Sequence, residues 1–467
     1  MTPRSNRYAV AVAAATQMLV VLDGAVLAVA LPQLAADLRI ETGALPWVIN
    51  AYTLPFAGLL LLGGRVADLI GPGSSIRVGV SIFALASLAA GSSPNLTVLL
   101  ISRALQGMGA ALLSPASLAL LTHSTSAGIE RERAIAIWSV TASVGASSSA
   151  LFGGVLTQLA GWRWVLLINV ALAPALYFGT LRVGRKSVAL EADTPRPPRG
   201  IDLPGTLLFL VAFGSADLAA TGGGSSSVLR TGAAAALAVA ALAGLVVVER
   251  RARHPLLPLH LLRRPEIAFP NGAAVLLLAG TAAMGYYFSQ YAQDVLLLSP
   301  FQTALTLLPG AMAGMLTASR VPALVRSFGE RRVRTLGPAM AGISLALLAG
   351  AQSRHWGPWQ LTPMLITMAI GGSVSVVTLT AAATRSLPRS QAGLASGLIS
   401  TSGQAGGSLG LALLTGVAGA VTGTATASTA MARSAAITSQ LVIALPIGAG
   451  LVLLGALCAF RIPGRID

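Results

Sequence analysis

Charge is scarce in this sequence. Aspartate, glutamate, lysine and arginine together make up 10% of the 467 residues, whereas hydrophobic residues make up 54%. Soluble domains carry about 25% charged residues, and a surface built from this composition would not stay dissolved in water. The composition therefore excludes a soluble globular protein. It predicts an all-α integral membrane protein, because apolar runs of about 20 residues form membrane-spanning helices.

Residues that build common catalytic centres are also rare. The single cysteine, Cys458, excludes a disulfide framework and a cysteine-based metal site. The single lysine, Lys186, follows Arg185, so the chain lacks the G-x-x-x-x-G-K-[ST] loop that binds nucleotide phosphates. The four histidines have no metal-ligand spacing; they are His123, His254, His260 and His355.

The motifs of several functional classes are missing as well. The sequence contains no H-E-x-x-H, no G-x-S-x-G and no filter sequence of the potassium-channel kind. We therefore expect that the protein is not an enzyme, is not driven directly by ATP, and holds no metal and no cofactor.

Fourteen apolar segments reach the length of a membrane helix. They lie near residues 8–31, 45–64, 76–93, 96–121, 134–159, 164–181, 203–221, 229–248, 267–291, 303–322, 333–351, 360–384, 394–420 and 439–460. An even number of spans places both termini on one side of the membrane. The first segment is similar to a secretory signal, but its length, its acid and the later spans predict that it is retained.

The distribution of basic residues predicts the orientation. With the termini inside, the outer segments hold only Arg39, Arg163, Arg230, Arg354 and Arg433, and every other basic residue outside the spans lies on the inner side. This asymmetry follows the positive-inside rule. It explains the net charge of +16 without nucleic acid as a partner.

The predicted location is the cytoplasmic membrane of a bacterium, with many spans and both termini in the cytoplasm. The basic residues are arginine except for Lys186, and alanine is abundant. This bias indicates a GC-rich genome, such as that of an actinobacterium.

Two linkers divide the chain. The proline-rich segment 182–202 and the basic segment 249–266 separate an N-terminal six-helix bundle at 1–181, two inserted helices at 203–248 and a C-terminal six-helix bundle at 267–467. A faint repeat relates the bundles: Gly71 and Gly79 follow an Arg-Val pair, as do Gly329 and Gly337. Internal repeats of this kind are typical of secondary transporters.

Four segments carry a family resemblance. They are "LDGAVLAVALP" with Asp23, "WVINAYTLPFAGLLLLGGRVADLIG", "RALQGMGAALLSP" with Arg103, and "YAQDVLLLSPFQTALTLLP". Together they resemble signatures of the major facilitator superfamily, and more narrowly of its fourteen-span drug:proton antiporters, the quaternary-ammonium and multidrug exporter type. The resemblance covers essentially the whole chain. It implies two pseudo-symmetric six-helix bundles plus two extra helices.

The resemblance implies a proton-coupled exporter of small amphipathic compounds, such as drugs, antibiotics or a metabolite of the host. The coupling ion would be a proton, the partners would be a small-molecule substrate and membrane lipid, and the protein would act as a monomer. It also implies a gating loop on the inner face and close helix packing at glycines. The gating residues are Gly64, Arg65, Asp68, Gly71 and Arg77, and the packing glycines are Gly107, Gly109, Gly153 and Gly154.

Asp23 stands in an otherwise apolar run, where an unpaired charge is costly. It lies ~12 Å from the outer end of a span that ends near Leu31, and Arg103 lies ~10 Å from the outer end of a span that begins near Leu96. The similar depth predicts an ion pair. A static pair that only orients two helices is one reading. In the other, Asp23 carries a proton, Arg103 switches it, and Gln106 holds a hydrogen bond to the carboxyl.

Two departures from the family pattern keep other functions open. No basic cluster follows Gly71, so either the contact that closes the inner side is weaker or Arg77 takes the place of the cluster. The fifth span has Ser149 and Ala150 where antiporters of this type have Gly-Pro. A symporter or facilitator of a small metabolite, or a membrane sensor that transports nothing, therefore remains an alternative.

Candidate residues of the substrate cavity are polar or aromatic side chains within the spans. They are Trp47, Asn50, Tyr52, Trp138, Asn169, Tyr286, Tyr287, Gln290, Gln293 and Asp294. Asp294 and Asp217 lie toward the outer ends of their spans, so a position in contact with water is expected for both. Either acid would attract a cationic substrate.

Overall fold

The computed structural model describes residues 3–126, 129–183, 202–221, 228–252, 261–352, 356–385, 392–422 and 430–463. In this part of the chain the elements are fourteen α-helices, a short 3-10 turn and a π-helical turn, with no strand. The predicted all-α fold is confirmed, and so is the number of helices.

The first bundle consists of α1 to α6. Its helices are α1 (Pro3–Leu38), α2 (Pro46–Ile70), α3 (Pro72–Gly91), α4 (Leu96–Ser124), α5 (Ile129–Ala160) and α6 (Trp162–Val183). Helix α4 packs against α1, α2 and α3, while α1 also contacts α5 and α6. Helix α4 is therefore the centre of this bundle.

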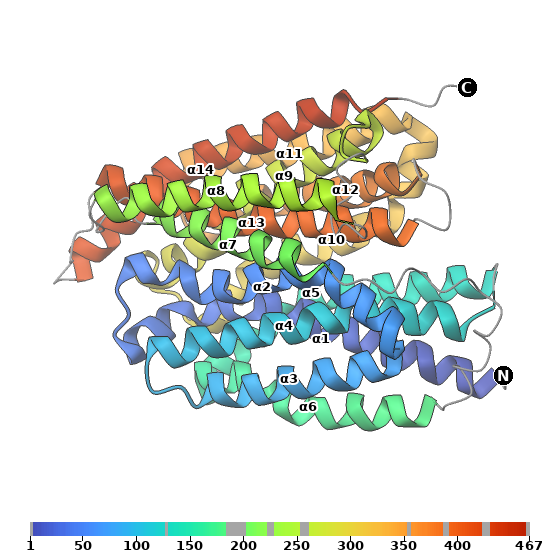
Figure 1. The fold of residues 1–467 in the computed structure, drawn as a ribbon. Helices are drawn as coiled ribbons and strands as arrows, with labels where there is room; N and C mark the ends of the chain where they lie inside the picture. The colour runs from blue at the N-terminus through green and yellow to red at the C-terminus, as the bar shows by residue number, and fades with distance from the viewer. Residues whose placement is uncertain are drawn as a thin grey trace.

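The second bundle consists of α9 to α14. Its elements are α9 (Pro265–Gln290), the π-helical turn η4 (Tyr291–Val295), α10 (Pro300–Phe328), α11 (Glu330–Gln352), α12 (Pro358–Arg385), α13 (Ala392–Thr422) and α14 (Ala430–Phe460). Helix α9 packs against α13 and α14, and α12 packs against α10 and α11. The two bundles lie one above the other in Figure 1.

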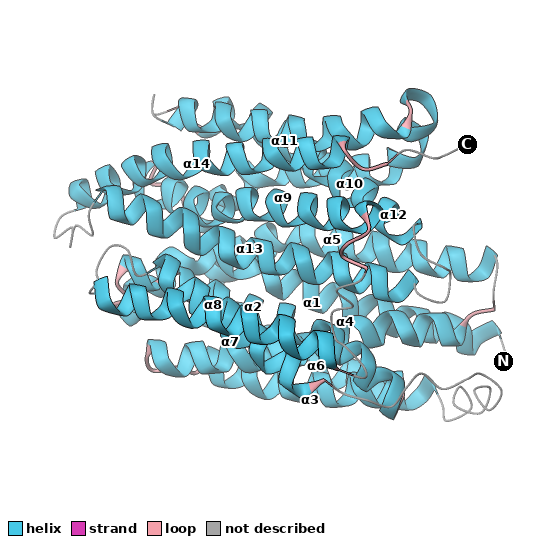
Figure 2. Ribbon diagram, turned by 45° about the horizontal axis from the view of Figure 1, so that its top comes forward, coloured by secondary structure: helices cyan, strands magenta, loops and turns pink. Residues whose placement is uncertain are grey.

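Helices α7 (Leu203–Thr221) and α8 (Val228–Arg251) pack against each other. Helix α7 also contacts α2 of the first bundle and α13 of the second. Figures 1 and 2 show the pair lying along the outside of the two bundles. The connections before α7 and after α8 lie mostly outside the described residues, and the domain limits proposed from the sequence stay a prediction.

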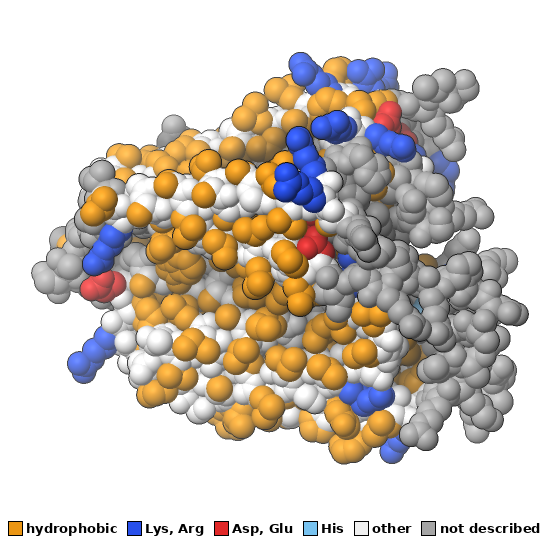
Figure 3. All heavy atoms as spheres, viewed as in Figure 1, with side chains coloured by type: hydrophobic (Ala, Val, Ile, Leu, Met, Phe, Trp, Pro, Cys, Tyr) orange, Lys and Arg blue, Asp and Glu red, His pale blue; other side chains and the backbone are white. Residues whose placement is uncertain are grey.

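Thirteen of the described helices are long and apolar enough to cross a membrane. The exception is α10, which contains Pro309 and Pro322 and ends near Arg326, but it packs against α5 and α12 as a full member of the bundle. Large apolar side chains cover the outside, with Leu85 69% and Val239 70% exposed. In Figure 3 hydrophobic side chains spread over the visible face and the charged ones gather toward its two ends. Such a surface fits a lipid environment.

Helices α2 and α3 meet at a single residue, so the expected gating loop is mostly helical. Gly71 separates them with φ 84° and ψ 148°, and Gly329 separates α10 from α11 with φ 82° and ψ 144°. Glycine adopts positive φ without the steric cost that other residues meet. The faint repeat in the sequence therefore marks the same sharp corner in both bundles.

The second glycine of each repeat lies at a close helix crossing. A Cβ on Gly79 would lie 3.0 Å from the Gly109 carbonyl oxygen, and a Cβ on Gly337 would lie 2.9 Å from the Ser375 hydroxyl. On the partner helix α12, a Cβ on Gly371 would lie 2.6 Å from the Gly337 carbonyl oxygen. The crossing of α3 with α4 thus has a counterpart in the crossing of α11 with α12.

This crossing yields a test with a neighbouring control. Gly371→Ala should destabilise the protein by about 1–3 kcal/mol, because the added methyl overpacks the contact with α11. Gly372→Ala should be tolerated, since nothing lies within 4 Å of its Cβ position. Thermal unfolding in detergent compares the two variants. Equal melting temperatures would contradict the close crossing.

Candidate functional site

Asp23 on α1 and Arg103 on α4 form a buried ion pair. Arg103 NH1 lies 2.9 Å from Asp23 Oδ2, and the side chains are 1% and 0% exposed. Helix α4 begins at Leu96, but α1 continues to Leu38, beyond the expected end near Leu31. The predicted pairing is therefore present, although the expected end of α1 was wrong. The helix continues through the partly polar segment 32–38.

Asn169 on α6 completes the surroundings of the carboxylate. Its Nδ2 donates to Asp23 Oδ1 at 2.6 Å, so both carboxylate oxygens accept a hydrogen bond. Asn169 was predicted to contact substrate, but its amide is 1% exposed and faces the acid. The acid is therefore held from two helices, α4 and α6.

Gln106 has a different partner from the one expected. Its Oε1 accepts from Arg103 NH1 at 2.9 Å, and its Nε2 donates to Ser87 Oγ at 2.7 Å. The expected hydrogen bond to the carboxyl is therefore wrong. Because Gln106 lies one turn along the same helix as Arg103, its amide oxygen meets the guanidinium before it can reach α1.

Helix α2 supplies the remaining contacts of the arginine. Arg103 Nε donates to the Val48 carbonyl at 3.4 Å, and the guanidinium lies 4.4 Å from the centre of the Tyr52 ring. The Tyr52 hydroxyl in turn donates to the Val20 carbonyl on α1 at 3.3 Å. Tyr52 was a cavity candidate, and the structure places it against the arginine by a cation–π contact.

Glycines bring these helices close enough for the network to form. A Cβ on Gly107 would lie 2.2 Å from the Tyr52 carbonyl oxygen, and one on Gly153 would lie 2.5 Å from the Val26 oxygen of α1. Gly109 packs against α3 in the same way, since a Cβ on it would lie 2.9 Å from the Gly79 carbonyl oxygen. Only glycine permits such backbone approach.

The ion pair has one member that can change its protonation, the Asp23 carboxylate. Arginine does not deprotonate in proteins, so a proton entering the site would bind the Asp23 carboxylate. The described side chains of the network all belong to α1, α2, α3, α4 and α6. The network is therefore contained within the first bundle.

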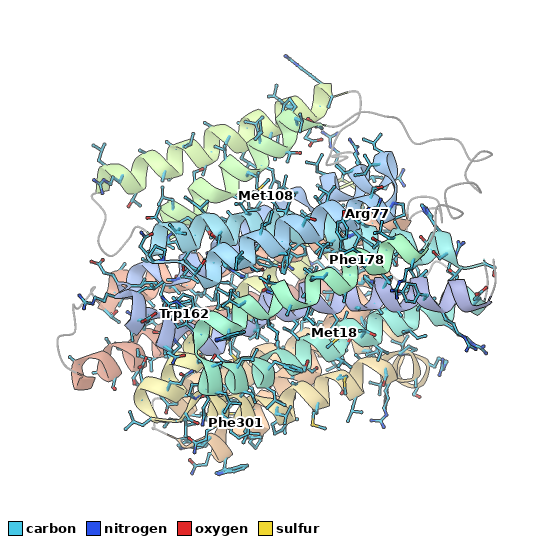
Figure 4. All side chains as sticks on the ribbon, turned by 90° about the horizontal axis from the view of Figure 1, so that it is seen from below. Met18, Arg77, Met108, Trp162, Phe178 and Phe301 are labelled. Carbon is cyan, nitrogen blue, oxygen red and sulfur yellow. The ribbon has the colours of Figure 1, made fainter. Side chains whose placement is uncertain are left out.

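The gating residues surround the corner at Gly71. Asp68 is exposed, Gly64 and Arg65 are half-buried, and both Arg65 and Asp68 make polar or electrostatic contacts. Arg77 donates from NH2 to Ser74 Oγ at 2.9 Å. It lines a surface groove of about 440 Å³ between α3 and α6, together with Tyr177, on the face that Figure 4 shows.

The cavity candidates do not converge on one site. Trp47 is half-buried on α2, and Trp138 on α5 donates from Nε1 to Ser117 Oγ at 3.0 Å. Tyr286 and Tyr287 are buried on α9 with ring centres 5.0 Å apart. Gln290, one turn further on, is 4% exposed.

Several candidates instead join the two bundles at the end of the molecule opposite the termini. Gln293 Nε2 donates to the Val29 carbonyl at 2.9 Å, and Asn50 Nδ2 approaches the Ser408 carbonyl at 3.4 Å. We call these two contacts, together with those of Phe301 with Gln158 and of Gly154 with Pro300, the distal seam. The Phe301 amide donates to Gln158 Oε1 at 3.3 Å.

Gly154 is the fourth member of the distal seam. A Cβ there would lie 2.6 Å from the Pro300 oxygen on α10, so this predicted packing glycine joins the bundles and does not act within one of them. Asp294 is half-buried beside the seam, and its backbone carbonyl accepts from Ser434 Oγ at 2.8 Å.

Asp217 is 0% exposed. The expected contact of Asp217 with water is therefore wrong, because α2 and α13 cover the end of α7.

Sequence reasoning missed a polar contact between α1 and α4 that lies apart from the ion pair. Ser114 Oγ on α4 donates to Gln17 Oε1 on α1 at 3.1 Å, one turn from the contact between Ser117 and Trp138. Ser87 and Ser408 were missed too. Serine is common in membrane helices for packing reasons, so these residues gave no signal.

Comparison with known proteins gives consistent matches. Residues 13–411 match the profile described as Major Facilitator Superfamily. The chain is 34% identical to the lincomycin resistance protein of Streptomyces lincolnensis, with 88% of this chain and 84% of the relative covered. It is 35% identical to the cephamycin export protein CmcT of Amycolatopsis lactamdurans (89% and 85% covered). It is 32% identical to the puromycin resistance protein pur8 of Streptomyces alboniger (96% and 89% covered).

Solved structures share the fold at low identity. The POT family transporter PepTSo matches with a TM-score of 0.66 and 17% identity, covering 98% of this chain and 97% of that one. The D-xylose-proton symporter matches with a TM-score of 0.66 and 12% identity, covering 97% and 96%.

The ion pair yields a stability test. Arg103→Met should destabilise the protein by about 3–5 kcal/mol, because it leaves the Asp23 carboxylate buried without its cation. The double variant Asp23→Leu with Arg103→Met should recover most of this loss, since no buried charge remains. Thermal unfolding of the two variants measures the difference. A double variant no more stable than Arg103→Met would show that packing of the arginine, and not charge, is decisive.

Proposed function

Because the chain belongs to the major facilitator superfamily, we propose that it is a proton-coupled transporter that exports small amphipathic compounds from a bacterial cell. The names of three relatives support this class of substrate, since they refer to lincomycin, cephamycin and puromycin. Members of the superfamily are membrane transporters and not enzymes. The substrate of this chain would be a drug, an antibiotic or a metabolite of the host.

The observation that carries the proposal is the buried pair of Asp23 and Arg103. Ionisable groups inside a membrane are expensive and usually functional, and this carboxylate is the member of the ion pair that can bind and release a proton. In the proposed cycle Arg103 favours the charged acid, and a change in hydration or spacing favours the protonated acid. The proton then drives the substrate against its gradient.

The closed distal seam supports alternating access. In the orientation predicted from the arginines, the seam lies on the outer side, and the proposed cycle assigns this arrangement to a state closed to the outside. Rocking of the two bundles would part the seam and open the site outward, as in other transporters built from repeats. Gln293 and Gly154 lie where the bundles separate.

A facilitator or symporter is the second candidate. It is favoured by α5, which runs from Ile129 to Ala160 without the Gly-Pro of related antiporters. At that place Ser149 Oγ donates to the Ala146 carbonyl of its own helix at 2.7 Å. Uptake of a fluorescent dye into everted vesicles, with and without a pH gradient, separates the candidates. An antiporter concentrates the dye only with the gradient, and a facilitator equilibrates it without one.

Asp23→Asn should abolish concentrative dye uptake into everted vesicles while leaving exchange down a substrate gradient partly active, because the variant keeps the shape of the site but carries no proton. Asp37→Asn is the control, since that carboxylate is 45% exposed at the end of α1. A variant Asp23→Asn that still concentrates the dye would overturn the assignment of the proton carrier.

Asp68→Asn should lower the transport rate and leave substrate affinity nearly unchanged. The reason is that Asp68 lies exposed beside the corner at Gly71, away from the buried pair, and would act in the conformational cycle. Equilibrium binding of a labelled substrate and dye uptake, measured on the same preparation, separate the two quantities. A loss of affinity as large as the loss of rate would contradict a role in gating.

A further inference from the structure

A second buried acid lies where the inserted helices meet both bundles. Asp217 is the only titratable residue of α7, and its side chain is 0% exposed. Ser408 Oγ, on α13 of the second bundle, donates to Asp217 Oδ2 at 3.2 Å. The amide of Asn50, on α2 of the first bundle, approaches the backbone carbonyl of the same Ser408 at 3.4 Å. Asp217 and Asn50 therefore both contact Ser408, and α7 packs against α2 and α13, one helix from each bundle.

Two oxygens in this cluster have no donor among the described residues. They are Asp217 Oδ1 and Asn50 Oδ1, both fully buried. Asn50 Nδ2 is directed to the Ser408 carbonyl at 3.4 Å. A buried acceptor that lacks a donor costs about 1–3 kcal/mol, and more when it is charged.

The elements around Asp217 supply no cation to pair with it. Helix α13 carries no titratable residue. On α2, Tyr52 packs against Arg103, and Arg65 and Asp68 lie at the opposite end of that helix. On α8, Glu249, Arg250 and Arg251 are at the opposite end, and Arg230 is exposed. An ionised carboxylate without a cation is not stable at such a depth.

We propose that Asp217 is a second proton-binding site, occupied when the distal seam is closed and empty when it is open. A proton on Oδ1 removes the buried charge and turns that oxygen into a donor, and Asn50 Oδ1 is an acceptor on the neighbouring helix that lacks one. When α13 parts from α2 and α7, water reaches the carboxyl, Ser408 no longer contacts it across the seam, and the proton is released to water. The proton bound at Asp217 thus stabilises the closed seam.

This inference rests on the proposed rocking of the bundles and adds a proton site on the inserted helices. The burial of Asp217 in the closed state determines the direction of the expected pH dependence. Because the closed state holds the additional proton, the ratio of closed to open seam falls as pH rises, by up to about tenfold per pH unit for one proton. A protein without this site would lack that part of the dependence.

Spin labels across the seam measure the ratio directly. The labels are placed on Leu159→Cys at the end of α5 and Trp359→Cys at the start of α12, in a Cys458→Ser background, since both side chains are more than 80% exposed. Double electron–electron resonance of the whole protein in nanodiscs of phosphatidylethanolamine and phosphatidylglycerol gives the populations at pH 5 to 9 without substrate.

Asp217→Asn keeps the shape of the protonated acid and cannot ionise. The Asp217→Asn variant should hold the seam closed at every pH. The unmodified chain should open as pH rises, and the control Asp37→Asn should behave like the unmodified chain. Ser408→Ala, which removes a hydrogen bond that only the closed seam makes, should move the midpoint of opening to lower pH. It also serves as a second variant if Asp217→Asn does not fold.

Two results would overturn the proposal: a pH dependence in Asp217→Asn equal to that of the unmodified chain, or populations in the unmodified chain that do not change with pH. Neither result depends on export. Asp23→Asn, measured with the same labels, should keep the dependence that Asp217 supplies. Failure of the proposed exporter would appear instead as no gradient-driven dye uptake while the seam populations still change with pH.

Discussion

The burial of one ion pair inside a membrane constrains much of the first bundle. Removing two charges from water costs several kcal/mol each, and their attraction offsets this only when the remaining polar atoms are also satisfied. Asn169 supplies the second donor to Asp23, and Gln106 and Val48 accept from Arg103. These partners come from different helices, so the helices must approach closely. Gly107 and Gly153 allow that approach.

The pair also makes two similar bundles chemically different. Alignment of the crossing glycines Gly109 and Gly371 places Leu365 and Met368 of α12 at the positions that Arg103 and Gln106 hold in α4. Leu365 is 2% exposed in an apolar core. The repeat therefore preserves corners and crossings, while the ionisable chemistry at this position belongs to the first bundle alone.

Sequence reasoning identified the superfamily, the all-α fold and the adjacency of Asp23 and Arg103. Each of these depends on composition, on motif spacing or on depth along a helix, which the sequence records directly. It did not predict that Asn169 faces the acid, that Gln106 faces the arginine, or that Asp217 is covered. Those properties depend on the rotation of a helix about its axis and on its neighbours. In a membrane helix that is apolar nearly all round, hydrophobic periodicity does not specify that rotation.

The two buried acids differ in how they would respond to rocking of the bundles. The described side-chain partners of Asp23 move with the first bundle, so a rigid rotation leaves its contacts intact and only hydration or a change within the bundle alters its charge. Asp217 lies on α7, which packs against both bundles, and accepts a hydrogen bond from Ser408 on α13, so the same rotation would change its surroundings. An acid that senses the rotation has to sit between the bundles. The inserted helix α7, which packs against both α2 and α13, provides such a position in this fourteen-helix chain.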